Sequence, residues 1–231
     1  MAGVYKVALI CVLIILLSIS CMAESEKFGS LKVENDFYNF GFLPIDYRVS
    51  HTYKIINDGQ GVLNITRLLN NCDCTTARIT NREIDPGDSA KVTIIFHTKN
   101  YYGQTTRTVT IFSNDPEKPE YDLKYKAELG LFPKLYKTNP ISLILLPSSK
   151  NKAIRILNNS EEDIDFEIEY LDNMYFSVDV REGNIGGKDS ALVNVSPIDS
   201  TPPGTHYCNF TVVYKAEEDI RITIPIRVVK Y

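Results

Sequence analysis

The chain has 231 residues, of which 44% are hydrophobic and 23% are charged, and its formal net charge is −4. This composition is ordinary for a globular protein with a packed core, and the length allows one or two domains. The acidic balance excludes the basic surface that nucleic-acid-binding proteins present, so no nucleic-acid partner is expected. The 14 Tyr and 10 Phe residues, interrupted by Gly and Pro, favour strands and turns.

Residues 1–23 have the layout of an export signal. Lys6 precedes an unbroken apolar run over residues 7–17, and small residues follow up to Ala23. Three outcomes stay open: cleavage after Ala23, lipid attachment at Cys21 in a segment that resembles a bacterial lipobox, or an uncleaved anchor over residues 7–23. Each predicts an exported protein of the periplasm or cell surface that meets the membrane only through this leader or a lipid anchor.

Residues 24–130 begin with a polar tether over 24–30 and then alternate strand patterns with turn signals. Strands are predicted over 31–33, 37–42, 50–57, 62–67, 77–79, 90–97, 106–113 and 121–129. The turns between them carry Gly, Asp, Asn and Pro, as at Pro86-Gly87. About seven such strands in about 100 residues are typical of an immunoglobulin-like (Ig-like) sandwich.

Several motifs in this segment follow one another in an order seen in a known family. They are Phe40-Gly41, Asn57-x-Gly59, Cys72-x-Cys74-Thr75, Ile84-x-Pro86-Gly87, Phe96, Gly103 and Ser113-Asn114-Asp115-Pro116. On these motifs, residues 37–130 resemble a bacterial family of exported domains of unknown function, which is similar to the Ig-like domains called ASH and major-sperm-protein domains. Asp73 stands where that family usually has Gly. The resemblance implies an Ig-like fold and a non-enzymatic interaction role, without naming a ligand.

A second copy of the unit follows the first. The segment around Asp88 returns around Asp189, an offset of 101 residues, and the same offset carries Ile55-Ile56-Asn57 onto Ile156-Leu157-Asn158 without a gap. We therefore predict an all-β protein of two tandem Ig-like β-sandwiches, over residues 24–130 and 131–231, behind the leader.

The second unit has its own strand and turn signals. Strands are predicted over 143–146, 152–157, 164–170, 176–180, 191–195, 207–214 and 220–229, with a turn over 183–187. Pro225 predicts that the last of these is an edge strand. The short apolar joint over 129–133 predicts a restricted angle between the units.

The candidate binding or redox site is a polar loop that carries two of the three cysteines outside the leader. It consists of Asn71, Cys72, Asp73, Cys74, Thr75 and Thr76, and the third cysteine is Cys208. Residues i and i+2 of an extended chain lie about 6.5–7 Å apart, so a disulfide between Cys72 and Cys74 needs a tight turn.

Three interpretations of this cysteine pair stay open. The first is a structural disulfide or packed thiol pair, the second a redox or partner-linking thiol, and the third a soft-metal site for an ion such as Cu(I). A zinc site would need two further ligands at finger spacing, which the sequence lacks. By the repeat, Asn173 and Tyr175 occupy the two cysteine positions in the second unit, so the pair belongs to the first unit alone.

No catalytic motif is present in the sequence. His51, His97 and His206 lie at no metal-binding spacing and next to no nucleophile motif. The first hypothesis is therefore a non-catalytic interaction module of the bacterial cell envelope, without a cofactor, whose partner is an unidentified envelope protein. The alternatives are a thiol-dependent redox or metal-handling protein that uses Cys72 and Cys74, and a structural spacer.

Overall fold

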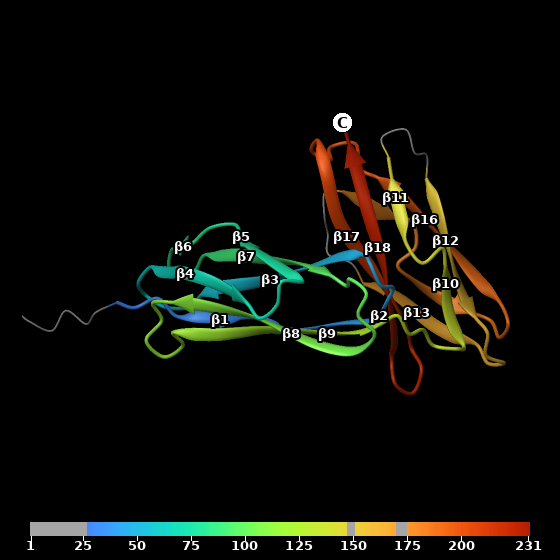
Figure 1. The fold of residues 1–231 in the computed structure, drawn as a ribbon, viewed down its shortest axis with the longest axis horizontal. Helices are drawn as coiled ribbons and strands as arrows, with labels where there is room; N and C mark the ends of the chain where they lie inside the picture. The colour runs from blue at the N-terminus through green and yellow to red at the C-terminus, as the bar shows by residue number, and fades with distance from the viewer. Residues whose placement is uncertain (1–26, 147–150, 170–174) are drawn as a thin grey trace, which may run out of the picture.

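The computed structural model describes residues 27–146, 151–169 and 175–231, and every regular element within them is a β-strand (Figure 1). The first nine strands are β1 (Leu31–Val33), β2 (Phe37–Leu43), β3 (Arg48–Asn57), β4 (Leu63–Asn70), β5 (Thr75–Ile79), β6 (Glu83–Ile84), β7 (Ser89–His97), β8 (Gly103–Ser113) and β9 (Glu120–Leu129). The next nine are β10 (Tyr136–Asn139), β11 (Leu143–Leu145), β12 (Lys152–Asn158), β13 (Ile164–Glu169), β14 (Phe176–Val178), β15 (Glu182–Ile185), β16 (Ser190–Pro197), β17 (Gly204–Tyr214) and β18 (Ile220–Lys230). None of the described residues forms a helix long and apolar enough to cross a membrane. The predicted leader, with Cys21, lies outside the described residues.

Strands β1 to β9, which we call the N-terminal half, form two sheets around one hydrophobic cluster. The smaller sheet has the order β1-β3-β7-β5 and the larger one the order β2-β9-β8-β4-β6. Successive side chains of a strand point to opposite faces, which buries every second residue of β7. The rings of Phe40 and Phe96 lie 5.8 and 5.2 Å from that of Tyr125 in the centre of the cluster. The half is thus a β-sandwich.

Strands β10 to β18, the C-terminal half, repeat this arrangement around a second cluster. Their smaller sheet has the order β10-β12-β16-β14, and β11, β18, β17, β13 and β15 form the larger one. Ile55 pairs with Ala90 between β3 and β7, and Ile156 pairs with Ala191 between β12 and β16. The offset of 101 residues therefore recurs as strand register.

The sequence prediction missed three short strands. These are β6, β10 and β15, so each half contains nine strands among the described residues instead of about seven. Strand β15 occupies part of the segment over 183–187 that was expected to turn. With two residues in β6 and three exposed residues followed by buried Ile185 in β15, neither strand shows the alternation that identifies a strand. Thr75 and Thr76 belong to β5, although they were assigned to a polar interruption between strands.

Pro225 does not mark an edge strand, so that prediction was wrong. Strand β18 pairs with β17 along one side and with β11 and β2 along the other. On the second side β11 pairs from Ile226 onward and β2 pairs at Ile222, and Pro225 lies between these two short pairings. No strand on that side pairs at Pro225, which accommodates the missing N–H within an inner strand.

The two halves are joined through strand pairing as well as through the chain. Phe42 of β2 pairs in parallel with Ile222 of β18, which connects the two larger sheets into one sheet of ten strands. Gly41 permits this approach because its φ is 67° and a Cβ atom there would lie 2.2 Å from the Arg221 carbonyl oxygen. Figure 1 shows the halves meeting at an angle at this point. The linker residues Leu131 and Phe132 are exposed, so the strand pairing contributes more to the joint than burial of the linker does.

Asp115, from the Ser-Asn-Asp-Pro motif, attaches β1 to the loop after β8. Its Oδ2 accepts a hydrogen bond from the Leu31 N–H (2.7 Å), and its Oδ1 accepts from the N–H groups of Glu117 (2.8 Å) and Lys118 (3.2 Å). Burial by itself raises the pKa of this carboxyl, but the three N–H donors and the Lys118 charge outweigh burial and hold the pKa below its usual range.

A carboxyl with a lowered pKa stabilises the fold above the pKa of the unfolded chain, about 4, and this contribution is lost as the pH falls through the folded pKa. Asp115→Asn is expected to lower the free energy of unfolding by about 1–2 kcal/mol at pH 7, and by less at pH 3. Urea unfolding at the two pH values measures this difference. Glu117→Gln, which changes an exposed carboxylate in the same loop, is the control. If Asp115→Asn lowered the free energy of unfolding equally at pH 7 and pH 3, the Asp115 carboxyl would not have the lowered pKa described above.

Candidate functional site

The loop between β4 and β5 carries a disulfide between Cys72 and Cys74. The two sulfur atoms lie 2.00 Å apart and the two Cα atoms 5.2 Å apart. The Cα separation is shorter than that of residues i and i+2 in an extended strand, because the backbone turns between the two cysteines. The structure therefore contains a disulfide at this pair, which both the structural and the redox interpretation allow.

Thr75 connects the disulfide to the hydrophobic core. Its hydroxyl oxygen lies 3.2 Å from the Cys72 sulfur and 3.8 Å from the Cys74 sulfur, and it forms a hydrogen bond with the Tyr125 hydroxyl. Cys74 and Thr75 are both 3% exposed. Burial raises the pKa of Tyr125 to about 12, so its hydroxyl keeps the proton and is available as a donor at neutral pH. The Cys-x-Cys-Thr motif therefore has an inner side, formed by Cys74 and Thr75, that anchors the loop.

The outer side of the loop is exposed and is held by polar contacts. Asn71, Asp73 and Thr76 are exposed, and the Asp73 carboxylate pairs with the Lys99 ammonium at 2.8 Å. The hydrogen bond from Lys99 lowers the pKa of Asp73. Asp73 has no left-handed backbone conformation, so the position does not require the Gly that is usual in the resembled family. Asn70 further fixes the loop, because its side-chain amide donates to the Thr75 carbonyl (3.0 Å).

The loop leads into β5, which is an edge strand. The His97 N–H donates to the Cys74 carbonyl and the Thr80 N–H donates to the Lys91 carbonyl, so the even-numbered residues of this segment bond to β7. Ala77 and Ile79 consequently direct their N–H and C=O groups away from β7. No strand among the described residues pairs with this side. The edge next to the disulfide loop is therefore open.

The three histidines lie in separate surroundings. His97 is 3.3 Å from a carboxylate oxygen of Asp46, and the His206 ring contacts the Pro202 carbonyl oxygen at 2.8 Å. His51 stacks on the Tyr38 ring at a centroid distance of 3.7 Å, and burial, with a smaller effect of the nearby Arg221 charge, lowers its pKa to about 3. His51 is thus neutral at physiological pH. The described residues contain no group of three or more His, Cys, Asp and Glu side chains that could hold a metal ion.

Cys208 is a free cysteine on β17, distant in sequence from the disulfide. It is 5% exposed, its thiol faces the Ile226 carbonyl oxygen at 3.6 Å, and burial raises its pKa to about 12. Such a thiol carries almost no thiolate at neutral pH and is a poor nucleophile. Asn173, the repeat position of Cys72, lies outside the described residues, and Tyr175, the repeat position of Cys74, stacks on His206.

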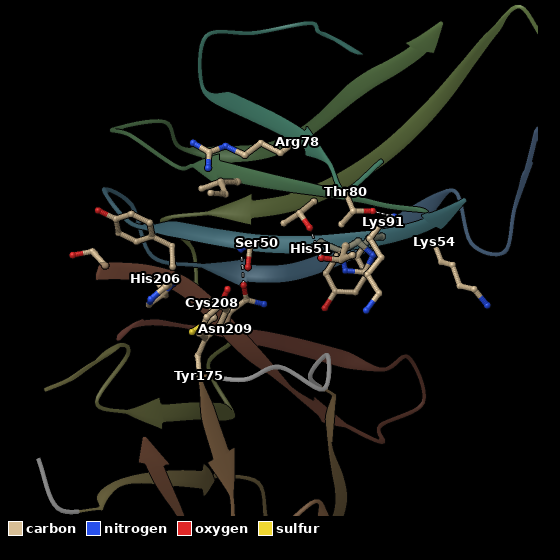
Figure 2. A pocket seen from close by; sticks show the side chains of 16 residues that line it. Ser50, His51, Lys54, Arg78, Thr80, Lys91, Tyr175, His206, Cys208 and Asn209 are labelled. Atoms are coloured by element: carbon tan, nitrogen blue, oxygen red, sulfur yellow. Dashed lines mark hydrogen bonds between the residues drawn. The ribbon is translucent and has the colours of Figure 1, made fainter. Parts of the chain in front are cut away.

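A cleft that was not predicted from the sequence lies between the two halves. Its walls are the outer face of the smaller N-terminal sheet and the first part of β17, and its volume is about 490 Å³ (Figure 2). Polar residues at alternate positions of β3 and β7, such as Thr52 and Thr93, could have indicated from the sequence that this sheet has a polar outer face. Nothing in the sequence indicates that β17 faces them, because that depends on how the halves are joined.

Comparison with protein families gives one match. Residues 31–129 match the profile described as Protein of unknown function (DUF1573). The matched segment begins at β1 and ends at β9, so it coincides with the N-terminal half and contains the disulfide loop. The predicted resemblance of this segment to a domain family of unknown function is confirmed to that extent. A comparison with curated proteins finds no match.

Solved structures with low similarity to this chain include proteins of several kinds. WR4, an MSP family member of C. elegans, is 14% identical with a TM-score of 0.36, and the alignment covers 41% of this chain and 98% of WR4. The periplasmic chaperone SfaE is 12% identical with a TM-score of 0.37, over 41% of this chain and 57% of SfaE. A Porphyromonas gingivalis W83 protein of unknown function is 10% identical with a TM-score of 0.36, over 86% of this chain and 99% of that protein. Similarity of this size supports no conclusion about ligands or partners.

Proposed function

We propose that this protein is a non-catalytic interaction module of the bacterial cell envelope. In this proposal residues 1–23 export the chain, ending in cleavage after Ala23 or in lipid attachment at Cys21, and the mature protein lies in the periplasm or at the cell surface. Residues 24–130 and 131–231 act as two Ig-like domains, and the two separate hydrophobic clusters support this division. The partner is another protein of the envelope.

The open edge of β5 is the observation that carries the proposal. An extended segment of a partner can add to an exposed strand edge, where backbone hydrogen bonds supply affinity. Ala77 and Ile79 present such unpaired groups, and the disulfide loop rigidly fixes the start of the strand. A rigid edge loses less conformational entropy on binding than a mobile one, which favours association.

The thiol-dependent alternative is less well supported by the same geometry. Thiol–disulfide exchange requires an incoming thiolate to reach a sulfur atom. Cys74 is 3% exposed, and Cys72 is half-buried against Thr75. We therefore assign the disulfide the role of holding the loop and the adjacent edge.

Ala77→Pro tests the proposal. Proline removes one outward N–H and places a ring on the open edge, while the bonds from β5 to β7 stay intact. Val178→Pro is the matched control, because Val178 lies 101 residues after Ala77 on the edge strand β14 and also faces away from its neighbour, β16. Tagged proteins recovered from envelope extracts, followed by quantitative mass spectrometry, measure partner capture.

The wild type and Val178→Pro are expected to recover the same partner, and Ala77→Pro to recover at least about tenfold less of it, which corresponds to the loss of one or two interfacial hydrogen bonds. Circular dichroism of the purified variants shows whether both retain their fold. The proposal fails if the wild type recovers no specific partner, or if Ala77→Pro and Val178→Pro bind alike.

A further inference from the structure

The cleft between the halves presents side chains rather than strand edges. Strand β3 lies between β1 and β7, β7 lies between β3 and β5, and β17 lies between β13 and β18. The backbone groups of these three strands are therefore used within their own sheets, and an extended peptide cannot add a strand to them. Strand β5 contributes the Arg78 side chain to the cleft, and its open backbone edge is the one considered above. Figure 2 shows the lining residues Arg78, Lys91 and Lys54 on the strands of the N-terminal half and Tyr175, His206 and Asn209 on the side of the C-terminal half.

The charge of the cleft is opposite to that of the whole chain. Its lining includes Lys54, Arg78 and Lys91 and no Asp or Glu, although the chain has a net charge of −4. Lys54 pairs with Glu34 at 2.9 Å, whereas the Arg78 and Lys91 side chains form no ion pair with any described residue. Two unpaired cations on one wall attract anions and can bind a carboxylate through charge-assisted hydrogen bonds.

The remaining lining is rich in hydroxyl groups and rings. Two stacked pairs lie among the lining residues, Tyr38 with His51 (3.7 Å) and Tyr175 with His206 (4.4 Å). The Tyr38 ring lies between His51 and the Arg221 guanidinium, so the ring faces that a ligand can contact are those of the Tyr175–His206 pair. The hydroxyl and amide side chains are those of Ser50, Thr52, Thr80, Thr93, Thr205 and Asn209. Hydroxyl and amide groups can both donate and accept hydrogen bonds, as sugar hydroxyls do, and ring faces pack against the apolar face of a pyranose.

We propose that this cleft binds an acidic oligosaccharide. Its carboxylates pair with Arg78 and Lys91, and its sugar rings contact the hydroxyl and aromatic side chains of the two walls. The cleft volume of about 490 Å³ falls within the range of about 300–1,000 Å³ usual for ligand sites. This binding uses side chains on the sheet faces, whereas the proposed function uses the backbone edge of β5, the strand to which Arg78 also belongs.

Isothermal titration calorimetry of the mature chain at low ionic strength tests the proposal with three probes. They are tetragalacturonate, the neutral maltotetraose, and tetraglutamate as an acidic peptide. Tetragalacturonate is expected to bind, and the double variant Arg78→Gln/Lys91→Gln to weaken its binding by about tenfold or more. Lys124→Gln/Lys137→Gln, which removes the same charge from exposed positions outside the cleft, is expected to change the affinity by less than about twofold.

The variants of Arg78 and Lys91 should melt like the wild type, because both side chains are exposed and unpaired. The proposal is overturned if tetragalacturonate does not bind, or if the cleft variant and the control variant bind it equally. It is also overturned if maltotetraose binds as tightly as tetragalacturonate, since the cleft would then not recognise the carboxylates. Equal binding of tetraglutamate would likewise overturn it, since the cleft would then not recognise the sugar rings.

Discussion

Asn57→Ala is expected to lower the free energy of unfolding by about 3–5 kcal/mol, because its side chain satisfies four backbone groups at once. Its Oδ1 accepts from the N–H groups of Ser30 and Gly59, each at 3.0 Å. Its Nδ2 donates to the carbonyls of Gly61 and Ile84, each at 2.8 Å. Asn57 is fully buried, so alanine would leave these groups without a partner and open a cavity.

The repeat supplies a second test of the same contact. Asn158, 101 residues later, is also fully buried and donates to the carbonyls of Glu162 (2.7 Å) and Ile185 (3.1 Å), the repeat positions of Gly61 and Ile84. Asn158→Ala is therefore expected to cost a similar amount. In both halves the Asn N–H also bonds to the carbonyl of the repeated Asp, Asp88 or Asp189.

Urea unfolding followed by circular dichroism measures both losses. Asn64→Ala is the control, since the Asn64 side chain forms no hydrogen bond with a described residue, and it should stay within about 0.5 kcal/mol of the wild type. A loss below about 1 kcal/mol for Asn57→Ala would show that the four contacts are not what holds these turns together.

These asparagines also explain why the repeat could be predicted from the sequence. A buried side chain with four fixed partners tolerates few replacements. The residues of the turns around Asn57 and Asp88 are therefore similar in both copies, and the repeat can be recognised from them. The long alternating strands were likewise predictable, because burial on one face imposes a period of two. Strands β6 and β15 were not, since β6 has only two residues and β15 does not alternate. Strand β10 was missed although its four residues alternate between buried and exposed.

The candidate site was predicted only in part, for a similar physical reason. The loop with Cys72 and Cys74 is contiguous, so composition alone identified it. The contact of Thr75 with Tyr125 joins residues 50 positions apart, and only the folded chain brings them together. The cleft joins β3 and β7 to β17, across the two halves, which are held together by the pairing of Phe42 with Ile222 and by the hydrogen bond from the Ser50 N–H to Asn209 Oδ1 (2.7 Å).

Arg221 is the side chain that makes this pairing strong. Its Nε donates to the Asn39 carbonyl (2.8 Å) on β2, and its Nη1 donates to Oε1 of Glu169 (2.9 Å) on β13. The guanidinium carbon also lies 5.8 Å from the centre of the Tyr38 ring. The pair with Glu169 lies within the C-terminal half and fixes the guanidinium, whose Nε then reaches the Asn39 carbonyl of the N-terminal half.

Arg221→Met is therefore expected to weaken the joint by about 1–3 kcal/mol, because it leaves the Asn39 carbonyl without its donor and removes the contact with Tyr38. It also destabilises the C-terminal half itself, because Glu169 on β13 loses its partner. Differential scanning calorimetry should show one cooperative transition for the mature wild type and two separated transitions for the variant, one for each half. Arg227→Met, an exposed position six residues later on the same strand, is the control and should keep the single transition. If Arg221→Met also melts in one transition at the wild-type temperature, the Arg221 side chain has no part in coupling the halves. The coupling would then lie in the pairing of β2 with β18 and in contacts such as the hydrogen bond from the Thr223 hydroxyl to the Phe40 carbonyl.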